Sequence, residues 1–301
     1  MSDRKKQVID SALQLFIEKG IEQTSLQDIL TRAGISKGTF YNYFASKNEC
    51  VLVILDRARY EASLQRQEML AGNDPTDIEL LIQQISVLLN INHQQNLIAV
   101  YNSILHSGDK ELKKMISLHR LHEHEWLAER FTDVFGEQVR PYSYEAAVLF
   151  YGMMQHISIT WRMTHDAPLD PVKAARTIIQ YIKEILPVMV KEKKALLDLE
   201  AMEMLKNNIE IHRVPKGDIL HLLGRLRQDI RTRPKQTPKN MLDLADVLFE
   251  ELSAANIRNA VVESLLRPFY KAFEDTPFAN EAREIAAKTS QYIKSTGKQT
   301  E

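Results

Sequence analysis

The sequence contains little of what several large protein classes require. Its 301 residues include one cysteine, Cys50, which excludes an internal disulfide and any metal site built from several cysteines. No N-terminal apolar run resembles a signal peptide, and no apolar stretch reaches 18 residues, so nothing indicates export or a membrane span. We therefore predict a cytoplasmic protein without a membrane partner.

Glycine, proline and net charge are scarce as well. The chain has ten glycines, ten prolines and a formal net charge of −1, and residues 1–60 hold only nine Lys or Arg against seven Asp or Glu. Charge alone therefore does not indicate a nucleic-acid partner. Because alternation of β-branched and polar residues is nearly absent, we predict an all-α fold with short connections.

Two helical patterns, each with its own start signal, occupy residues 24–47. Ser25 precedes the apolar positions of the first helix, and Asp28 stands at the capping-box position three residues later. Gly34 supplies the left-handed backbone that ends a helix, and Ser36 can cap the next one. The pattern predicts a helix-turn-helix with its turn at residues 33–36.

The second helix of this motif has two unlike faces. At about 100° per residue, Phe40 and Phe44 share the inward face, whereas Gly38 and Asn42 lie opposite. An Asn amide can pair with a base edge, so the outer face suits a DNA groove. Ser46 then caps a further helix whose first turn contains Lys47, and a cation beside exposed amides suits a phosphate.

Residues 24–47 resemble the N-terminal DNA-binding domain of the tetracycline-repressor (TetR) family. The resemblance is carried by Ile29, by the run AGISKGTFYNYF at 33–44, and by Ser46 and Lys47; Leu30, Asn48 and Cys50 depart from the usual pattern. It implies major-groove contacts by Lys37, Gly38, Thr39 and Asn42, and phosphate contacts by Ser25, Tyr41, Tyr43 and Lys47. The alternative is an ordinary helical segment in which the tyrosines lie at the core boundary and Lys47 is solvated.

No enzyme motif is supported. Residues 34–38 spell the G-x-S-x-G string of a hydrolase, but that motif needs a strand before the serine, and residues 26–33 have helical spacing. His119 and His122 share a helical face, yet no third metal ligand can be named. We predict no enzymatic activity, no cofactor and no metal.

The middle of the chain is predicted to be a helical effector-binding and dimerisation domain. A long helix runs from Lys47 to Leu70, and amphipathic segments follow at 76–92, 94–106, 109–119 and 120–135. Residues 144–164 are apolar nearly all round and must be covered on more than one side. From Pro171 a seam of apolar residues recurs at 3,4 spacing, and Pro187 is expected to kink or end that helix. The seam residues are Ala175, Ile178, Ile182, Ile185 and Met189. The resemblance implies that helices 144–164 and 171–189 pair with their copies in a homodimer; the alternative is burial within one chain.

In the family, a cavity between these helices admits a small, usually apolar effector. Candidate lining residues here are Tyr101, Trp126, Tyr151, His156 and Trp161, together with Met153 and Met154. The alternative is that aromatic and methionine side chains form plain core. The sequence does not identify the effector.

The resemblance ends near residue 195, and further apolar stripes follow within 219–230, 241–252 and 261–273. The expected domains are therefore 1–48, 49–194 and 195–301, the last an additional helical extension. Its stripes either pack on one another or cover the body, and we expect the second because residues 195–205 continue the preceding helix.

The function that follows is a homodimeric TetR-like transcriptional regulator, with a repressor expected. It would bind a palindromic double-stranded DNA operator and be released by an unknown small-molecule effector. The alternative is a DNA-binding structural or scaffold protein, without ligand control, whose extension recruits a partner.

Overall fold

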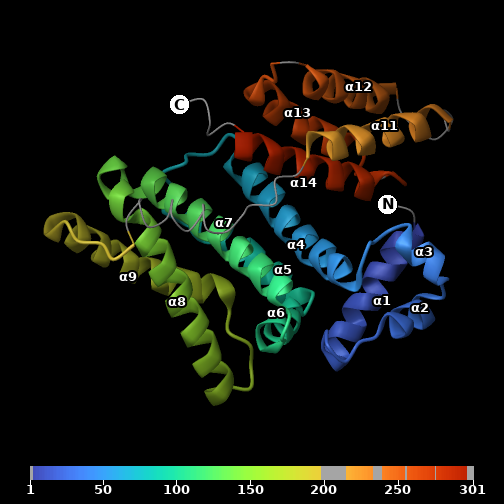
Figure 1. Ribbon diagram of the computed structural model, residues 1–301. Coiled ribbons are helices and arrows are strands. Elements are labelled where there is room, and N and C mark those ends of the chain that lie inside the picture. Colours follow the sequence, from blue (N-terminus) through green and yellow to red (C-terminus); the bar gives the residue numbers. More distant parts are fainter. Residues whose placement is uncertain (1–2, 198–214, 233–238, 255, 275, 297–301) are drawn as a thin grey trace. The chain divides into compact units, whose positions relative to one another are not determined.

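The computed structural model describes residues 3–197, 215–232, 239–254, 256–274 and 276–296 (Figure 1). These residues form helices and connections and contain no strand, which confirms the all-α prediction. No helix in this described part combines the length and the apolar character that a membrane span requires.

The helices follow one another with short connections. The first four are α1 (Asp3–Lys19), α2 (Leu26–Ala33), α3 (Lys37–Tyr41) and α4 (Lys47–Leu70). The middle of the chain contains α5 (Ile78–Gln94), α6 (Leu97–His106), α7 (Lys110–Phe135), the short 3₁₀ helix η1 (Glu137–Val139), α8 (Arg140–Thr164) and α9 (Pro171–Glu192). The last are α11 (Lys216–Thr232), α12 (Lys239–Ser253), α13 (Asn259–Ala272) and α14 (Ala279–Thr296).

The described residues fall into two compact units. The first unit contains those of 1–12, 30–43 and 212–301, and the second contains 13–29 and those of 44–211. The first unit therefore includes α3 and the C-terminal helices, and the second includes α4 to α9.

Most helix boundaries follow the predicted signals. Gly20 and Gly34 adopt positive φ angles of 79° and 60° at the ends of α1 and α2, where a residue with a Cβ would be strained. Two boundaries differ from prediction. Residues 110–135 form one helix rather than two, and α3 ends at Tyr41, so Asn42 caps the helix and Phe44 lies beyond it.

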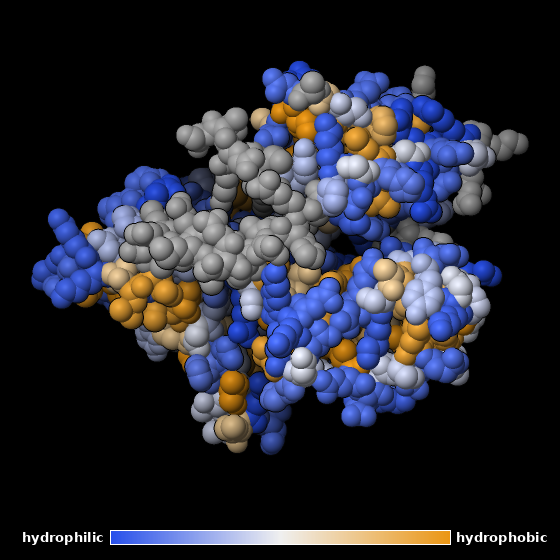
Figure 2. All heavy atoms as spheres, viewed as in Figure 1, coloured by the Kyte–Doolittle hydropathy of each residue, from blue (hydrophilic) through white to orange (hydrophobic). Residues whose placement is uncertain are grey.

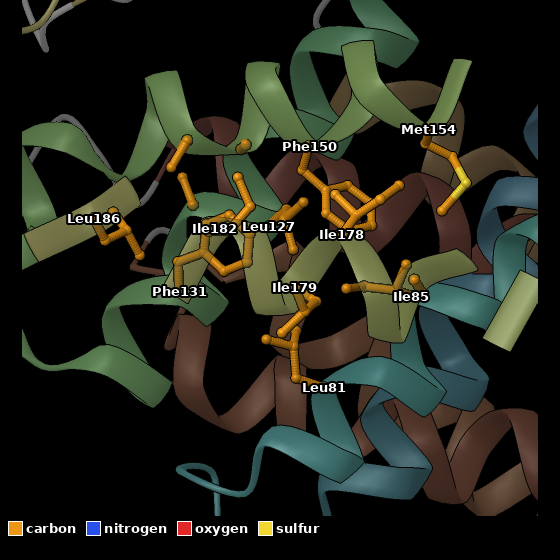
Figure 3. Close-up of a cluster of buried hydrophobic side chains, with 14 of the residues drawn as sticks. Leu81, Ile85, Leu127, Phe131, Phe150, Met154, Ile178, Ile179, Ile182 and Leu186 are labelled. Atoms are coloured by element: carbon orange, nitrogen blue, oxygen red, sulfur yellow. The ribbon is translucent and has the colours of Figure 1, made fainter. Parts of the chain in front are cut away.

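The core of the second unit lies between α5, α7, α8 and α9 (Figure 3). Phe131 and Phe150 meet edge to face with ring centroids 6.5 Å apart. Each of these helices therefore has one face in a shared apolar core, and burying such faces stabilises the fold. The side chains labelled in the figure are Leu81, Ile85, Leu127, Phe131, Phe150, Met154, Ile178, Ile179, Ile182 and Leu186.

The predicted dimer seam on α9 is part of this intrachain core. Ala175, Ile178 and Ile182 are fully buried without any second chain, and Met189 is 8% exposed. Positions spaced for a helix partner cannot show whether that partner is in the same chain, and here α5 and α8 supply it. The prediction that these residues form the dimer contact was wrong.

Helix α9 also differs from expectation at its C-terminal end. It continues past Pro187 to Glu192, and Lys193 then adopts a left-handed backbone with φ of 51°. A left-handed residue ends an α-helix, so α9 does not run on into residue 195 as predicted. The predicted continuation beyond residue 197 lies outside the described residues.

Helices α11 to α14 pack on one another. Each contacts the next along the chain, and α14 closes back on α11 (Figure 1). Their buried side chains include the three predicted stripes and a fourth on α14 that the sequence reading missed. The fully buried members are Ile219, Leu223, Leu226, Ala245, Leu248, Leu252, Val262, Phe269, Phe273, Ala282, Ile285 and Ala286. The described part of the extension is thus a four-helix bundle with its own core.

Candidate nucleic-acid interface and buried polar clusters

The turn before α3 is fixed by backbone and cap contacts. The Ile35 amide donates to the Leu30 carbonyl at 3.1 Å, and Ser36 Oγ accepts from the Thr39 amide at 3.1 Å. Phe40 is fully buried. The cap and the inward aromatic hold α3 in one orientation on the preceding turn, as the sequence predicted.

The opposite side of α3 is exposed. Lys37, Gly38 and Asn42 lie in solvent, and Tyr41 is 49% exposed. Thr39 and Tyr43 are half-buried, and Thr39 Oγ1 lies 2.9 Å from Ser36 Oγ. This surface offers a cation, an amide, a phenol and a close backbone approach at Gly38, which are the groups that read or hold DNA.

In the second unit, Ser25 forms the predicted capping box with Asp28. Ser25 Oγ accepts from the Asp28 amide at 3.1 Å, and the Ser25 amide donates to Asp28 Oδ2 at 2.9 Å. The hydrogen bond from the Ser25 amide also holds the pKa of Asp28 below its usual value. Ser25 is exposed, and its hydroxyl donates to Asp28 Oδ2 at 2.9 Å, so a phosphate contact by this hydroxyl would have to replace that hydrogen bond.

Lys47 has a structural role that the sequence did not reveal. Its Nζ donates to the carbonyl oxygens of Ile21 and Thr24 at 2.7 and 2.8 Å. Burial lowers the pKa of this ammonium. Two of its three donors therefore tie the start of α4 to the connection between α1 and α2, and one donor remains.

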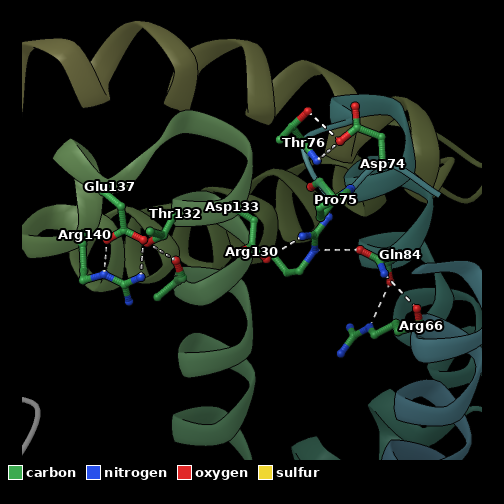
Figure 4. A network of polar contacts seen from close by, with 11 residues as sticks. Arg66, Asp74, Pro75, Thr76, Gln84, Arg130, Thr132, Asp133, Glu137 and Arg140 are labelled. Atoms are coloured by element: carbon green, nitrogen blue, oxygen red, sulfur yellow. Dashed lines mark hydrogen bonds and ion pairs between the residues drawn. The ribbon is translucent and has the colours of Figure 1, made fainter. Parts of the chain in front are cut away.

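A buried polar network fixes the far end of α4 (Figure 4). Arg66 Nε donates to the Gln84 carbonyl at 3.0 Å, and Gln84 Nε2 returns a hydrogen bond to the Arg66 carbonyl at 2.8 Å. Arg130 Nε donates to Gln84 Oε1 at 2.9 Å, and its NH2 donates to the Pro75 carbonyl at 2.9 Å. We call Arg66, Gln84 and Arg130 the Arg66 clamp. It joins α4, α5 and α7 with well-formed hydrogen bonds in a buried site.

The same arginine holds an acidic group. Arg66 NH1 lies 2.9 Å from Glu123 Oε2, and the guanidinium stacks on the Trp126 ring at 3.6 Å. Tyr151 donates its hydroxyl to Glu123 at 3.3 Å. Burial alone would raise the pKa of Glu123, but the neighbouring Arg66 and Arg59 hold it below its usual value, so Glu123 is ionised.

A second polar cluster lies two to three turns earlier on α4. It comprises Asp56 and Arg59 of α4, Tyr101 of α6, and His119 and Glu123 of α7, and we call it the Arg59 cluster. His119 is 4% exposed, and its Nε2 lies 2.9 Å from Asp56 Oδ1. Burial, reinforced by Arg59, lowers the pKa of His119, so the ring is neutral at pH 7.

The structure brings together three of the five predicted pocket residues. Tyr151 donates a hydrogen bond to Glu123, and Trp126 stacks against Arg66, which pairs with Glu123. Tyr101 interacts with the Glu123 charge. His156 is exposed on α8. Trp161 stacks on His165 at 3.7 Å and donates to the Ala167 carbonyl at 2.9 Å. These two residues therefore lie at the surface and at the α8–α9 connection, and their place in an effector pocket stays a prediction.

Sequence reasoning missed Arg59, Arg66, Glu123, Gln84 and Arg130. The sequence signal that could have revealed the arginines is the spacing of Asp56, Arg59 and Arg66, which places three charged residues on one side of α4. Within the described residues, no three His, Cys, Asp or Glu side chains gather closely enough to hold a metal. His119 instead faces Asp56.

Comparison with known proteins agrees with the geometry of α2 and α3. Residues 8–54 match the model for bacterial regulatory proteins of the tetR family. The chain therefore contains a DNA-binding domain of the type found in this family. It is a DNA-binding transcriptional regulator with a helix-turn-helix, as the resemblance in its sequence implied.

Individual relatives extend this result. An uncharacterised HTH-type transcriptional regulator, YuxN of Bacillus subtilis, is 23% identical over 291 residues, covering 95% of this chain and 97% of that protein. The regulator EthR of Mycobacterium tuberculosis is 34% identical over 77 residues, covering 26% of this chain and 36% of EthR. The repressor BepR of Brucella suis is 26% identical over 90 residues, covering 30% of this chain and 43% of BepR. Because the first similarity spans nearly the whole chain, it includes most of residues 195–301.

Proposed function

We propose that this TetR-like regulator is a cytoplasmic homodimeric repressor that binds a palindromic operator through α3 and leaves it when a small effector binds. The observation that carries the DNA role is the two-sided α3, with Phe40 buried and Lys37, Gly38 and Asn42 exposed. An aromatic anchor positions the helix, and the exposed groups can reach bases and phosphates. A relative from Brucella suis is named a transcriptional repressor, which supports that sign of regulation.

The dimer contact is proposed on the outer faces of α8 and α9, in place of the seam at 175–189. Large apolar side chains are exposed there. The two on α8 are 14 residues apart, about four turns, and the two on α9 are seven residues apart, about two turns, so each pair lies on one face of its helix. They are Leu149 and Met163 on α8, and Tyr181 and Val188 on α9, with exposed fractions from 39% to 80%. Figure 2 shows apolar side chains gathered on the surface formed by these helices. Exposed apolar patches of this kind mark association sites.

Ligand control is proposed for the second unit, where the Arg66 clamp and the Lys47 contacts hold α4 at its two ends. We propose that α4 has two positions, one that binds the operator and one that does not. A ligand that binds between the two anchors and prefers the second position lowers the DNA affinity by the ratio of its affinities for the two positions. Since α4 begins directly after the helix-turn-helix, movement of α4 is a direct route to the DNA-contacting residues.

The experiment measures operator affinity with and without each stabilising compound from a metabolite thermal-shift panel. A ligand-controlled regulator shows equal coupling factors in both directions, because linkage is reciprocal. A scaffold protein without ligand control shows operator binding that no stabilising compound changes.

A further inference from the structure

Arg59 carries a half-buried charge with incomplete compensation. Its side chain is 20% exposed, and Oδ1 of its acidic partner Asp56 lies 3.8 Å from NH1, beyond hydrogen-bond distance. Its Nε is buried and has no hydrogen-bond partner. Arg66, two turns later, has the same chemistry but is fully engaged by Gln84, Glu123 and Trp126. An unpaired buried guanidinium donor destabilises a fold, so its presence requires an explanation.

The groups around Arg59 are also poised to donate or accept hydrogen bonds. Burial raises the pKa of Tyr101 to about 12, so its hydroxyl keeps its proton and can donate. His119 Nδ1 is buried without a hydrogen-bond partner in a side chain that is 4% exposed. The charge of Arg59 also acts on the ionisation of Tyr101, His119 and Glu123, lowering the pKa of each.

We propose that Arg59 binds a carboxylate of the effector. This inference rests on the ligand control proposed above and names the chemical class of the ligand. A guanidinium with a free Nε donor matches the planar, two-oxygen geometry of a carboxylate. A doubly charged phosphate is disfavoured because Asp56 and Glu123 already place two negative charges in the cluster. A monoanion instead compensates the Arg59 guanidinium, whose Nε lacks a hydrogen-bond partner.

The position of Arg59 connects the ligand to DNA binding. Arg59 lies on α4 between Lys47, about 18 Å away along the helix, and the clamped Arg66. Lys47 holds the carbonyls of Ile21 and Thr24. A carboxylate that draws Arg59 toward α6 and α7 shifts α4 between its two anchored ends and, with it, this connection before α2.

The first test compares two arginines of one helix without ligand. Arg59→Gln should leave the melting temperature unchanged or raise it, because the lost charge had no hydrogen-bonded partner. Arg66→Gln should lower it by several degrees, because it leaves Gln84 and Glu123 buried without their donor. An Arg59→Gln variant that loses as much stability as Arg66→Gln would show that Arg59 is structural and overturn the proposal. Arg59→Lys repeats the comparison with the charge retained.

The second test uses matched probes: the carboxylates from acetate to dodecanoate, benzoate, and their neutral amides. At least one carboxylate should stabilise the wild-type protein and bind about tenfold or more tightly than its amide. Arg59→Gln should remove that preference, and Arg59→Lys should restore part of it. Equal binding of acid and amide, or no binding by any carboxylate in the series, would overturn the proposal.

Operator titrations separate this inference from the proposed function. If a carboxylate binds through Arg59 without changing operator affinity, the ligand class stands and effector release is wrong. If a neutral ligand releases DNA equally from wild type and Arg59→Gln, effector release stands and the carboxylate assignment is wrong.

Discussion

The ammonium group of Lys47 lies 2.8 Å from the carbonyl oxygen of Thr24 and ties the start of α4 to the connection that precedes α2. A residue proposed to hold a phosphate thus also stabilises the protein. The two roles predict different effects of substitution, so they can be measured separately.

Lys47→Ala should weaken binding to operator and to random duplex DNA alike, because a phosphate contact does not read sequence. A dimer loses two such contacts, so the slope of log affinity against log salt should become shallower by about 1.8. The melting temperature should also fall, since two backbone carbonyls lose their donor. The control is Lys183→Ala on the exposed side of α9. A reduced melting temperature with an unchanged salt slope would leave Lys47 with the structural role alone.

Asn42→Ala should act differently, because its exposed amide at the end of α3 is proposed to pair with one base. The expected loss is about 1–3 kcal/mol per half-site on the preferred operator and much less on operators altered at that base. Competition binding with single-base operator variants measures this. Equal losses on every variant would assign Asn42 a positioning role.

Gln84→Leu should destabilise the protein by about 3 kcal/mol. The substitution removes the side-chain donor of the Arg66 carbonyl and leaves Arg130 Nε buried without a partner, and an unsatisfied buried donor destabilises the folded state. Chemical denaturation measures the change. Gln83→Leu, one residue earlier and exposed, is the matched control and should change stability little. Similar effects of both substitutions would show that the Arg66 clamp contributes nothing to stability.

Val188→Asp should convert the dimer to a folded monomer, because Val188 is 58% exposed on the proposed dimer face. Ile182→Ala, one and a half turns earlier and fully buried, should instead cost about 2–5 kcal/mol of stability and leave the association unchanged. Light scattering and denaturation of both variants separate the two faces of α9. A dimer that survives Val188→Asp would place the contact elsewhere.

Residues 210–301 should fold alone with a cooperative melt, because α11 to α14 bury their apolar faces on one another. Phe269, which is fully buried and 5.0 Å from the Phe273 ring, tests that core. Phe269→Ala should abolish the melt, and Val247→Ala, at a 45% exposed position, should preserve it. A fragment without a cooperative transition would mean that the bundle depends on the rest of the chain.

The sequence predicted those parts of the structure that local chemistry determines. Ser36, Gly34 and Phe40 specified α3 and its turn, because caps, left-handed glycines and helical spacing act within a few residues. The α9 seam was misassigned because spacing identifies a buried face but not the chain that covers it. The different roles of Arg59 and Arg66 could not be predicted for a related reason. Both lie on one helix, and only the fold shows that Arg66 is hydrogen-bonded to Gln84 and Glu123 whereas Arg59 is not.

The central claim is that α3 reads a palindromic DNA sequence, and selection from a random duplex library tests it most directly. Wild-type protein should enrich an inverted repeat whose half-sites lie about 34–36 Å apart, or a multiple of that spacing. The Asn42→Ala variant should lose selectivity at one position of each half-site. Enrichment of no sequence by the wild-type protein, or identical enrichment by wild type and Asn42→Ala, would contradict this account.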